Sequence, residues 1–152
     1  MKGKALEAGS AMQILKPAHE VFEAIVDPTK MSRYFIARGS GRMEEGRHLV
    51  WKFPEFDTEF PIEVGKIEID RFVSWSWTNP EGKTLVAEIK LAPRGSSATV
   101  VSVTERGMMN DEAGMEWLKG NSAGWAYFLS CLKAYLEYGI NLRKGAFDFR
   151  KG

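Results

Sequence analysis

One acidic side chain is the strongest candidate for chemistry in this sequence. Glu105 ends the alternating segment 98–107, in which Thr99, Val101 and Val103 share the apolar face. By strand parity its carboxylate points the same way, toward the protein interior. There it would accept a hydrogen bond from a ligand or act as a general acid or base. The simpler interpretation, which we favour from sequence alone, is that Glu105 lies at the end of the strand and reaches water.

The other reactive side chains give little evidence of a metal or catalytic site. The two histidines, His19 and His48, lie on different elements, and both are expected to face solvent. A metal site needs several converging ligands, so we predict no metal and no cofactor. Cys131 lies among apolar helical residues and is expected to be a buried, inert thiol. We therefore assign no catalytic residue.

Aromatic residues are abundant, with nine Phe, five Trp and four Tyr. They predict either a solid, bulky core or a cavity lined by rings, and their pattern alone does not decide between the two. In the second case the ligand would lie between strand side chains and the last helix. The residues predicted to line such a cavity are Phe22, Phe35, Trp51, Phe53, Ile62, Trp75, Trp77, Ile89, Val103, Glu105, Trp125, Phe128 and Leu132.

The first third of the chain predicts a strand and two short helices. Residues 7–15 alternate weakly, as in a strand. Pro17 then opens a helix whose apolar residues recur at i, i+3, i+4 and i+7, and Pro28 ends it. Residues 29–35 predict a second short helix.

The middle of the chain changes to a period of two, which is typical of strands. Segments 47–53 and 59–70 predict two strands, and 71–93 predicts a hairpin around the turn NPEGK. Within 59–70 the apolar parity slips across Gly65, although Ile67 and Ile69 continue an apolar row. A slip of one residue would turn the strand over, so we predict a β-bulge or sharp bend at Gly65.

From Asp111 the helical period returns and continues to Gly139, which suits an N-cap and a glycine C-cap respectively. Gly120 and Gly124 interrupt this helix, and each weakens it by about 1 kcal/mol relative to alanine. We therefore expect a kink or a close approach to the sheet near Gly124. On the far face, Lys133 and Glu137 are predicted to point to water.

Length, charge and composition bound the class of protein. The 152 residues suit one domain, 1–152, with a core at about 10–140 and a basic tail, 141–152, that is expected to fray. With 21 basic and 20 acidic residues the net charge is +1, which argues against nucleic-acid binding. No apolar run approaches the roughly 20 residues of a membrane span. With a single cysteine and no apolar signal segment, we expect a cytoplasmic protein.

Four stretches carry a resemblance to a known family: PAHEVFEAIVDPTKMSRYF, DRFVSWSWT, LAPRGSSATVVSVTERGM and GWAYFLSCLKAYLEYG. Their order and spacing resemble the START/Bet v 1-like (SRPBCC) superfamily, and within it the family related to the C-terminal domain of the activator of Hsp90 ATPase. The resemblance covers roughly residues 10–140. One departure is Tyr34, where family members usually have Trp.

The resemblance implies an α+β helix-grip fold. Its curved antiparallel sheet of about six to seven strands wraps around a long C-terminal helix, with two short helices after the first strand. It also implies a scaffold for hydrophobic ligands, because relatives in the superfamily bind lipids, sterols, polyketides or hormones. Hsp90 is not expected as a partner, since the chain resembles a stand-alone module without the co-chaperones' N-terminal domain.

Three functions remain open at this point. We favour binding of a small hydrophobic or amphipathic molecule in a cavity between the sheet and the last helix. The second is an enzyme of cyclase or hydrolase type that uses the same cavity, with Glu105 as acid or base. The third is a protein-interaction module, either a homodimer or a chaperone partner. The sequence favours a binding protein over an enzyme.

Overall fold

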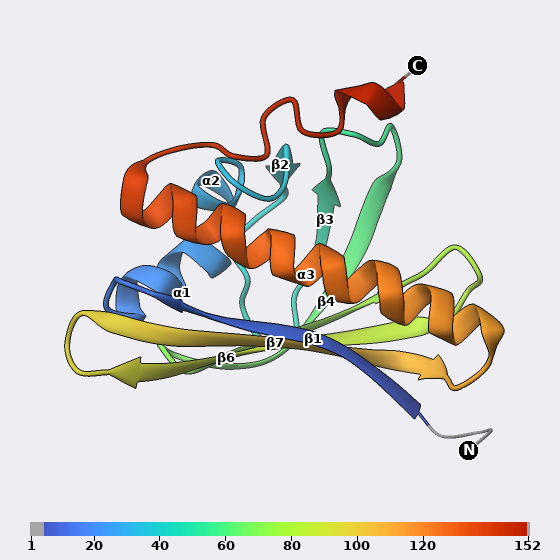
Figure 1. The fold of residues 1–152 in the computed structure, drawn as a ribbon, viewed down its shortest axis with the longest axis horizontal. Helices are drawn as coiled ribbons and strands as arrows, with labels where there is room; N and C mark the ends of the chain where they lie inside the picture. The colour runs from blue at the N-terminus through green and yellow to red at the C-terminus, as the bar shows by residue number, and fades with distance from the viewer. Residues whose placement is uncertain (1–4, 152) are drawn as a thin grey trace.

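The computed structural model describes residues 5–151, with side chains described for residues 5–150. Within them, seven strands form one antiparallel sheet in the order β1-β7-β6-β5-β4-β3-β2. Figure 1 shows the sheet curving, so that β3 and β4 rise steeply from the plane of β1, β6 and β7. The strands are β1 Ala5–Ile14, β2 Arg38–Gly39, β3 His48–Lys52, β4 Glu59–Glu68, β5 Phe72–Thr78, β6 Thr84–Arg94 and β7 Ala98–Met109.

Two short helices follow the first strand, and one long helix covers the sheet. The helices are α1 Ala18–Val26, α2 Pro28–Met31 and α3 Glu112–Tyr138, with a final 3-10 turn η1 at Asp148–Lys151. Figure 1 shows α3 crossing the concave side of the sheet. This arrangement confirms the predicted α+β helix-grip architecture. None of the helices in the described chain is long and apolar enough to span a membrane.

The predicted bulge lies where the parity slips. The β4–β5 register shifts between Val64 and Ile67. A Cβ on Gly65 would lie 2.6 Å from the Ser74 Oγ, so a larger residue would displace that hydroxyl from its hydrogen bond to the Lys66 carbonyl. The prediction that Ile69 continues the apolar row of this strand is wrong. Its side chain is 75% exposed, because β4 ends at Glu68 and the chain turns away.

A second irregularity sets the side-chain direction at the end of β7. Leu6 pairs with Met108 and Glu7 with Arg106, so Gly107 is the extra residue of a bulge. Its φ is +139°, and a Cβ there would lie 2.4 Å from the Thr84 carbonyl oxygen. Because the bulge absorbs one residue, Met108 and Glu105 are both buried despite their odd spacing.

The core is packed unevenly along α3. Apart from Gly114 near the start of the helix, its buried residues all lie at or beyond Trp125. Phe128, Leu129 and Leu132 pack there against a sheet face that includes Trp51 and Trp75. Residues 115–124 are half-buried or exposed, although the helix lies across the sheet along this length. Between Gly114 and Trp125 the helix therefore buries no side chain fully, and only Trp117 and Leu118 pack partly against the core.

Both predicted caps of α3 are present. The Asp111 carboxylate accepts a hydrogen bond from the Gly114 N–H at 2.7 Å, and Gly139 closes the helix with a φ of +67°. Gly114 also permits close contact with the end of β7, because a Cβ on it would lie only 1.9 Å from the Met109 carbonyl oxygen. These contacts fix where the helix starts relative to the sheet.

The far end of α3 is tied to the loop after β1. Lys133 donates to the Gln13 carbonyl at 2.9 Å and to Glu137, which also accepts from the Leu15 N–H at 2.8 Å. The expectation that these two side chains face water is wrong for Glu137, whose side chain is only 7% exposed. Burial alone raises the pKa of Glu137, but the bonds from Leu15 and Lys133 outweigh it, so its pKa lies below the ordinary value.

We predict that Glu137→Gln lowers the free energy of unfolding by about 1–2 kcal/mol at neutral pH, because two hydrogen bonds to a charged group are weakened. A depressed folded-state pKa stabilises the protein above the unfolded-state pKa and ceases to do so as the pH falls through the folded value. Urea unfolding should therefore show the difference shrinking in acid. Glu116→Gln, exposed on the same helix, is the control. An equal loss at all pH values would contradict this role for Glu137.

Candidate functional site

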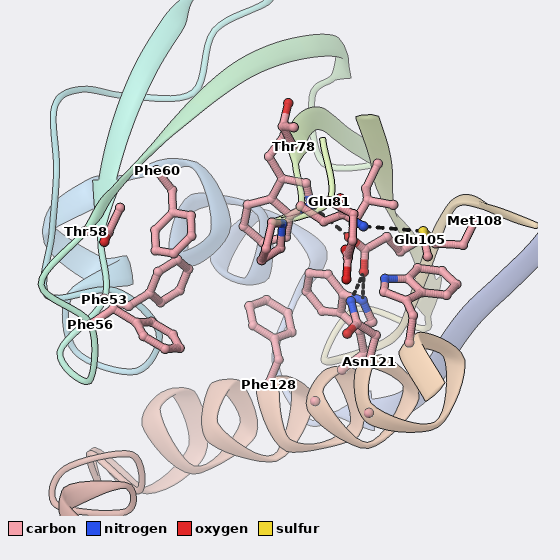
Figure 2. Close-up of a pocket in the computed structure, with 18 of the residues that line it drawn as sticks. Phe53, Phe56, Thr58, Phe60, Thr78, Glu81, Glu105, Met108, Asn121 and Phe128 are labelled. Carbon is pink, nitrogen blue, oxygen red and sulfur yellow. Dashed lines mark hydrogen bonds between the residues drawn. The ribbon is translucent and has the colours of Figure 1, made fainter. Parts of the chain in front are cut away.

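A cavity of about 1070 Å³ lies under the N-terminal half of α3, where the helix stands away from the strands. Its walls come from α3, from the ends of β5, β6 and β7, and from the β3–β4 connection. Figure 2 shows the phenylalanines Phe53, Phe56 and Phe60 at one end and Glu105 with Asn121 at the other. The cavity therefore has an aromatic end and a polar end.

The aromatic end is a set of rings packed edge to face. Phe35 contacts Phe128 at 4.7 Å and Phe53 at 5.2 Å between ring centroids, and Phe53 contacts Phe60 at 5.4 Å. Edge-to-face pairs support one another, so this wall holds its shape. It offers a flat or elongated apolar molecule a large rigid surface.

At the polar end, Glu105 is fully buried. Its Oε2 accepts from the Trp77 indole N–H at 2.8 Å, and its Oε1 accepts from Trp125 at 2.9 Å and from the Asn121 amide at 2.7 Å. It forms no ion pair with any residue of the described part of the chain. The expectation that Glu105 reaches water is therefore wrong: three neutral donors from β5 and α3 hold it inside.

Gly120 and Gly124 lie in the helical wall, one turn apart. A Cβ built on either glycine meets no atom within 4 Å, and both residues line the cavity. The predicted kink or close approach near Gly124 is wrong, because α3 continues unbroken from Glu112 to Tyr138. The glycines leave room beneath the helix instead.

The C-terminal tail closes one side of the cavity, contrary to the expectation that it frays. Arg143 forms an ion pair with Glu55, and the two side chains are only 12% and 6% exposed. The guanidinium lies 5.6 Å from the Phe53 ring centroid and 5.4 Å from that of Phe147. Phe147 in turn packs on Tyr127 at 5.4 Å. The basic and aromatic residues clustered in the tail were the available signal for this cation–π packing.

Six of the thirteen predicted lining residues are in the cavity wall: Phe35, Phe53, Trp77, Glu105, Trp125 and Phe128. The other seven are buried in the packed core and are not among the residues that line this cavity: Phe22, Trp51, Ile62, Trp75, Ile89, Val103 and Leu132. Strand parity identifies which face is inward. It does not reveal that only one end of the face is left uncovered.

Sequence reasoning missed the hydrogen-bond partner on the helix and, apart from Phe53, the β3–β4 connection. Asn121 lies one turn before Trp125, so both side chains reach the same carboxylate. Phe56 and Thr58 belong to that connection, which has no periodic pattern. The helical spacing of Asn121 and Trp125 could have signalled the first, whereas nothing local signalled the second.

The described residues contain no group of three or more His, Cys, Asp or Glu side chains placed to hold a metal ion. Burial raises the pKa of the Cys131 thiol, as expected for an inert cysteine. His19 is exposed and bonds to Asp70 at 2.9 Å, and neither residue is among those that line the cavity. The chemistry of the site therefore rests on Glu105 and its neighbours.

Comparisons with known proteins agree with this fold. The family model described as "Activator of Hsp90 ATPase homolog 1-like protein" matches residues 16–137. Among solved structures, the protein SSP2350 from Staphylococcus saprophyticus is 31% identical, with a TM-score of 0.77 over 91% of this chain and 96% of that one. No curated protein matches the sequence.

Two more distant structures share the fold. Aha1 from Colwellia psychrerythraea, described as a dimer, is 19% identical, with a TM-score of 0.71 over 88% of this chain and 98% of that one. DynU16, described as a putative protein in the dynemicin biosynthetic locus, is 24% identical, with a TM-score of 0.77 over 88% of this chain and 48% of that one. At these identities the likeness shows the fold alone.

We predict that Gly120→Ala and Gly124→Ala each raise the free energy of unfolding by about 1 kcal/mol, because alanine favours the helix and its methyl group enters open space. Gly114→Ala is the contrasting control and should destabilise strongly, since its Cβ would collide with the Met109 carbonyl. Urea denaturation measures all three. Destabilisation by both cavity-facing alanines would mean that the helix has no free space beneath it.

Proposed function

Since the chain belongs to the family of activator of Hsp90 ATPase homolog 1-like proteins, we propose that it binds a small hydrophobic or amphipathic molecule between the sheet and α3. The observation that carries this proposal is the cavity of about 1070 Å³ with an aromatic end and, at the other end, the fully buried carboxylate of Glu105. Ligand sites are typically apolar hollows of about 300–1,000 Å³ with a few well-placed polar groups.

The two ends of the cavity would contribute differently to binding. Contact with the Phe35, Phe53 and Phe60 rings removes apolar ligand surface from water, at about 25 cal/mol per Å². Glu105 then orients the ligand, because its hydrogen bonds to Trp77 and Trp125 fix the position of its oxygens. The rings would supply most of the affinity, and the carboxylate the orientation.

Catalysis by Glu105 is the second candidate, favoured by the position of this carboxylate in the cavity wall. Three donors already occupy most of its acceptor positions, however, and they suit a fixed acceptor better than a group that picks up and releases a proton. An acid–base reaction would also need a partner group on the ligand's other side. We therefore rank binding first.

The surroundings we propose for this function are the cytoplasm, where the lone, buried Cys131 would remain a thiol. Self-association is an alternative, since one structural relative is described as a dimer. An interaction module needs no internal hollow, whereas ligand binding does. The cavity therefore supports ligand binding more than either a homodimer or a chaperone contact.

We predict that 9-anthracenemethanol, quercetin or palmitate shifts the tryptophan emission on titration, because Trp77, Trp117 and Trp125 line the cavity. Gly124→Leu should weaken the responding ligand at least tenfold by placing a side chain in the space. Ala123→Leu, a neighbouring exposed position outside the cavity wall, should bind normally. An unresponsive wild-type protein, or equal loss in both variants, would count against the proposed site.

A further inference from the structure

The ionisable residues in the cavity wall are strongly unbalanced. The wall contains five glutamates and one arginine, and neither lysine nor histidine. Arg143 is already paired with Glu55. Glu59 is paired with Arg38 at 3.2 Å. The glutamates without an ion pair to any described residue are Glu81, Glu105 and Glu116.

These three carboxylates are arranged from the solvent inward. Glu116 on α3 and Glu81 in the β5–β6 turn are exposed, whereas Glu105 is fully buried. Figure 2 shows Glu81 and Glu105 on the same side of the cavity, opposite the phenylalanines. A ligand that enters to this depth therefore meets acidic groups both at the surface and inside.

The hydrogen bonds of Glu105 neither neutralise the carboxylate nor fill all of its acceptor positions. Its three donors are neutral N–H groups, which orient the carboxylate but do not neutralise it. A carboxylate offers about four acceptor positions. Oε1 accepts two bonds and Oε2 only one, so one acceptor position of Oε2 has no donor among the described residues. Burying an anion without a counter-charge is costly, and an incoming cation would reduce that cost.

Building on the ligand-binding function proposed above, we infer that the cavity selects an organic amine: an amphipathic molecule whose ammonium group bonds to Glu105. The apolar body of the amine then lies against the Phe35 and Phe53 wall. The indole N–H groups of Trp77 and Trp125 hold the carboxylate oxygens in place, so the ammonium meets an acceptor whose position is already fixed. Glu81 and Glu116 favour the approach of a cation and oppose that of an anion.

The test compares three ligands with one tricyclic body: 9-(aminomethyl)anthracene, 9-anthracenemethanol and 9-anthracenecarboxylate. Anthracene fluorescence anisotropy at neutral pH and low salt gives each Kd. We expect the amine to bind at least tenfold more tightly than the alcohol, and the alcohol more tightly than the carboxylate. Desolvation alone favours the alcohol over the ammonium, so hydrophobic binding cannot produce this order.

The outcomes separate the two proposals. An alcohol that binds as tightly as the amine, or a carboxylate that binds best, overturns the amine inference and leaves ligand binding in place. If none of the three binds and the panel with quercetin and palmitate also gives no response, the binding function falls, and the amine inference falls with it.

Glutamine substitutions test whether the carboxylates cause the preference for the amine. Glu105→Gln should reduce the amine-to-alcohol preference at least tenfold, because the side chain keeps its size and loses its charge. Since a glutamine amide would face one of the three donors, this variant could fail to fold. The double variant Glu81→Gln/Glu116→Gln at the surface is therefore measured as well, and should reduce the preference two- to fivefold.

The matched control removes two exposed glutamates outside the cavity wall, Glu7 and Glu63, by the same change to glutamine. It changes the net charge by the same amount and should leave the preference within twofold of wild type. If the cavity variants and the control behave alike, the preference arises from overall charge, and the assignment to this site is wrong.

Discussion

The buried carboxylate of Glu105 joins the sheet to the helix at the boundary between solid core and open space. Its partners are Trp77 on β5 and Asn121 and Trp125 on α3, while Glu105 itself is on β7. From Trp125 onward the helix buries its inner face on the sheet, whereas residues 115–124 are half-buried or exposed. Hydrogen bonds to a charged group are stronger than neutral ones, so Glu105 adds to the ring contacts of Trp125 with Trp75 and Trp77 in joining helix and sheet at this boundary.

The architecture around this anchor depends on a few backbone irregularities. The bulge at Gly65 bends the sheet so that β3 and β4 turn up behind α3, as Figure 1 shows. The bulge at Gly107 lets Met108 and Glu105 face the same interior. At the other end, the tail returns across the structure, and the Arg143–Glu55 pair closes the side of the cavity. The cavity therefore results from the curved sheet together with the returning tail, and the Glu105 carboxylate lies at its inner end.

The elements of this fold could be predicted because their signals are local. Alternation, helical spacing and turn residues identify six of the seven described strands, the three helices and both caps of α3. The two-residue strand β2 is too short to show alternation, and the second helix, predicted over 29–35, covers only Pro28–Met31. The Gly65 bulge could also be predicted, because a parity slip is visible within one strand. The family resemblance then supplied the order in which these elements pack.

The site was harder to predict because it depends on non-local distances. Parity correctly places Trp51, Trp75 and Trp77 inward, yet only Trp77 lies where α3 has moved away. The prediction for Glu105 failed because its donors lie 16 to 28 residues away in sequence. The tail was missed for the same reason: its anchor, Glu55, is 88 residues from Arg143.

Several residues around the cavity lower the stability of the fold, and this cost indicates that they serve a function. Gly120 and Gly124 each weaken α3 by about 1 kcal/mol relative to alanine, although a methyl group would fit at both positions. Glu105 is buried without a cation, where an apolar residue would avoid the desolvation cost. The two glycines and Glu105 all lower stability, and all three line the same cavity. Local departures from the most stable sequence that coincide in space are typical of functional sites, and here they lie around the innermost carboxylate that a ligand would meet.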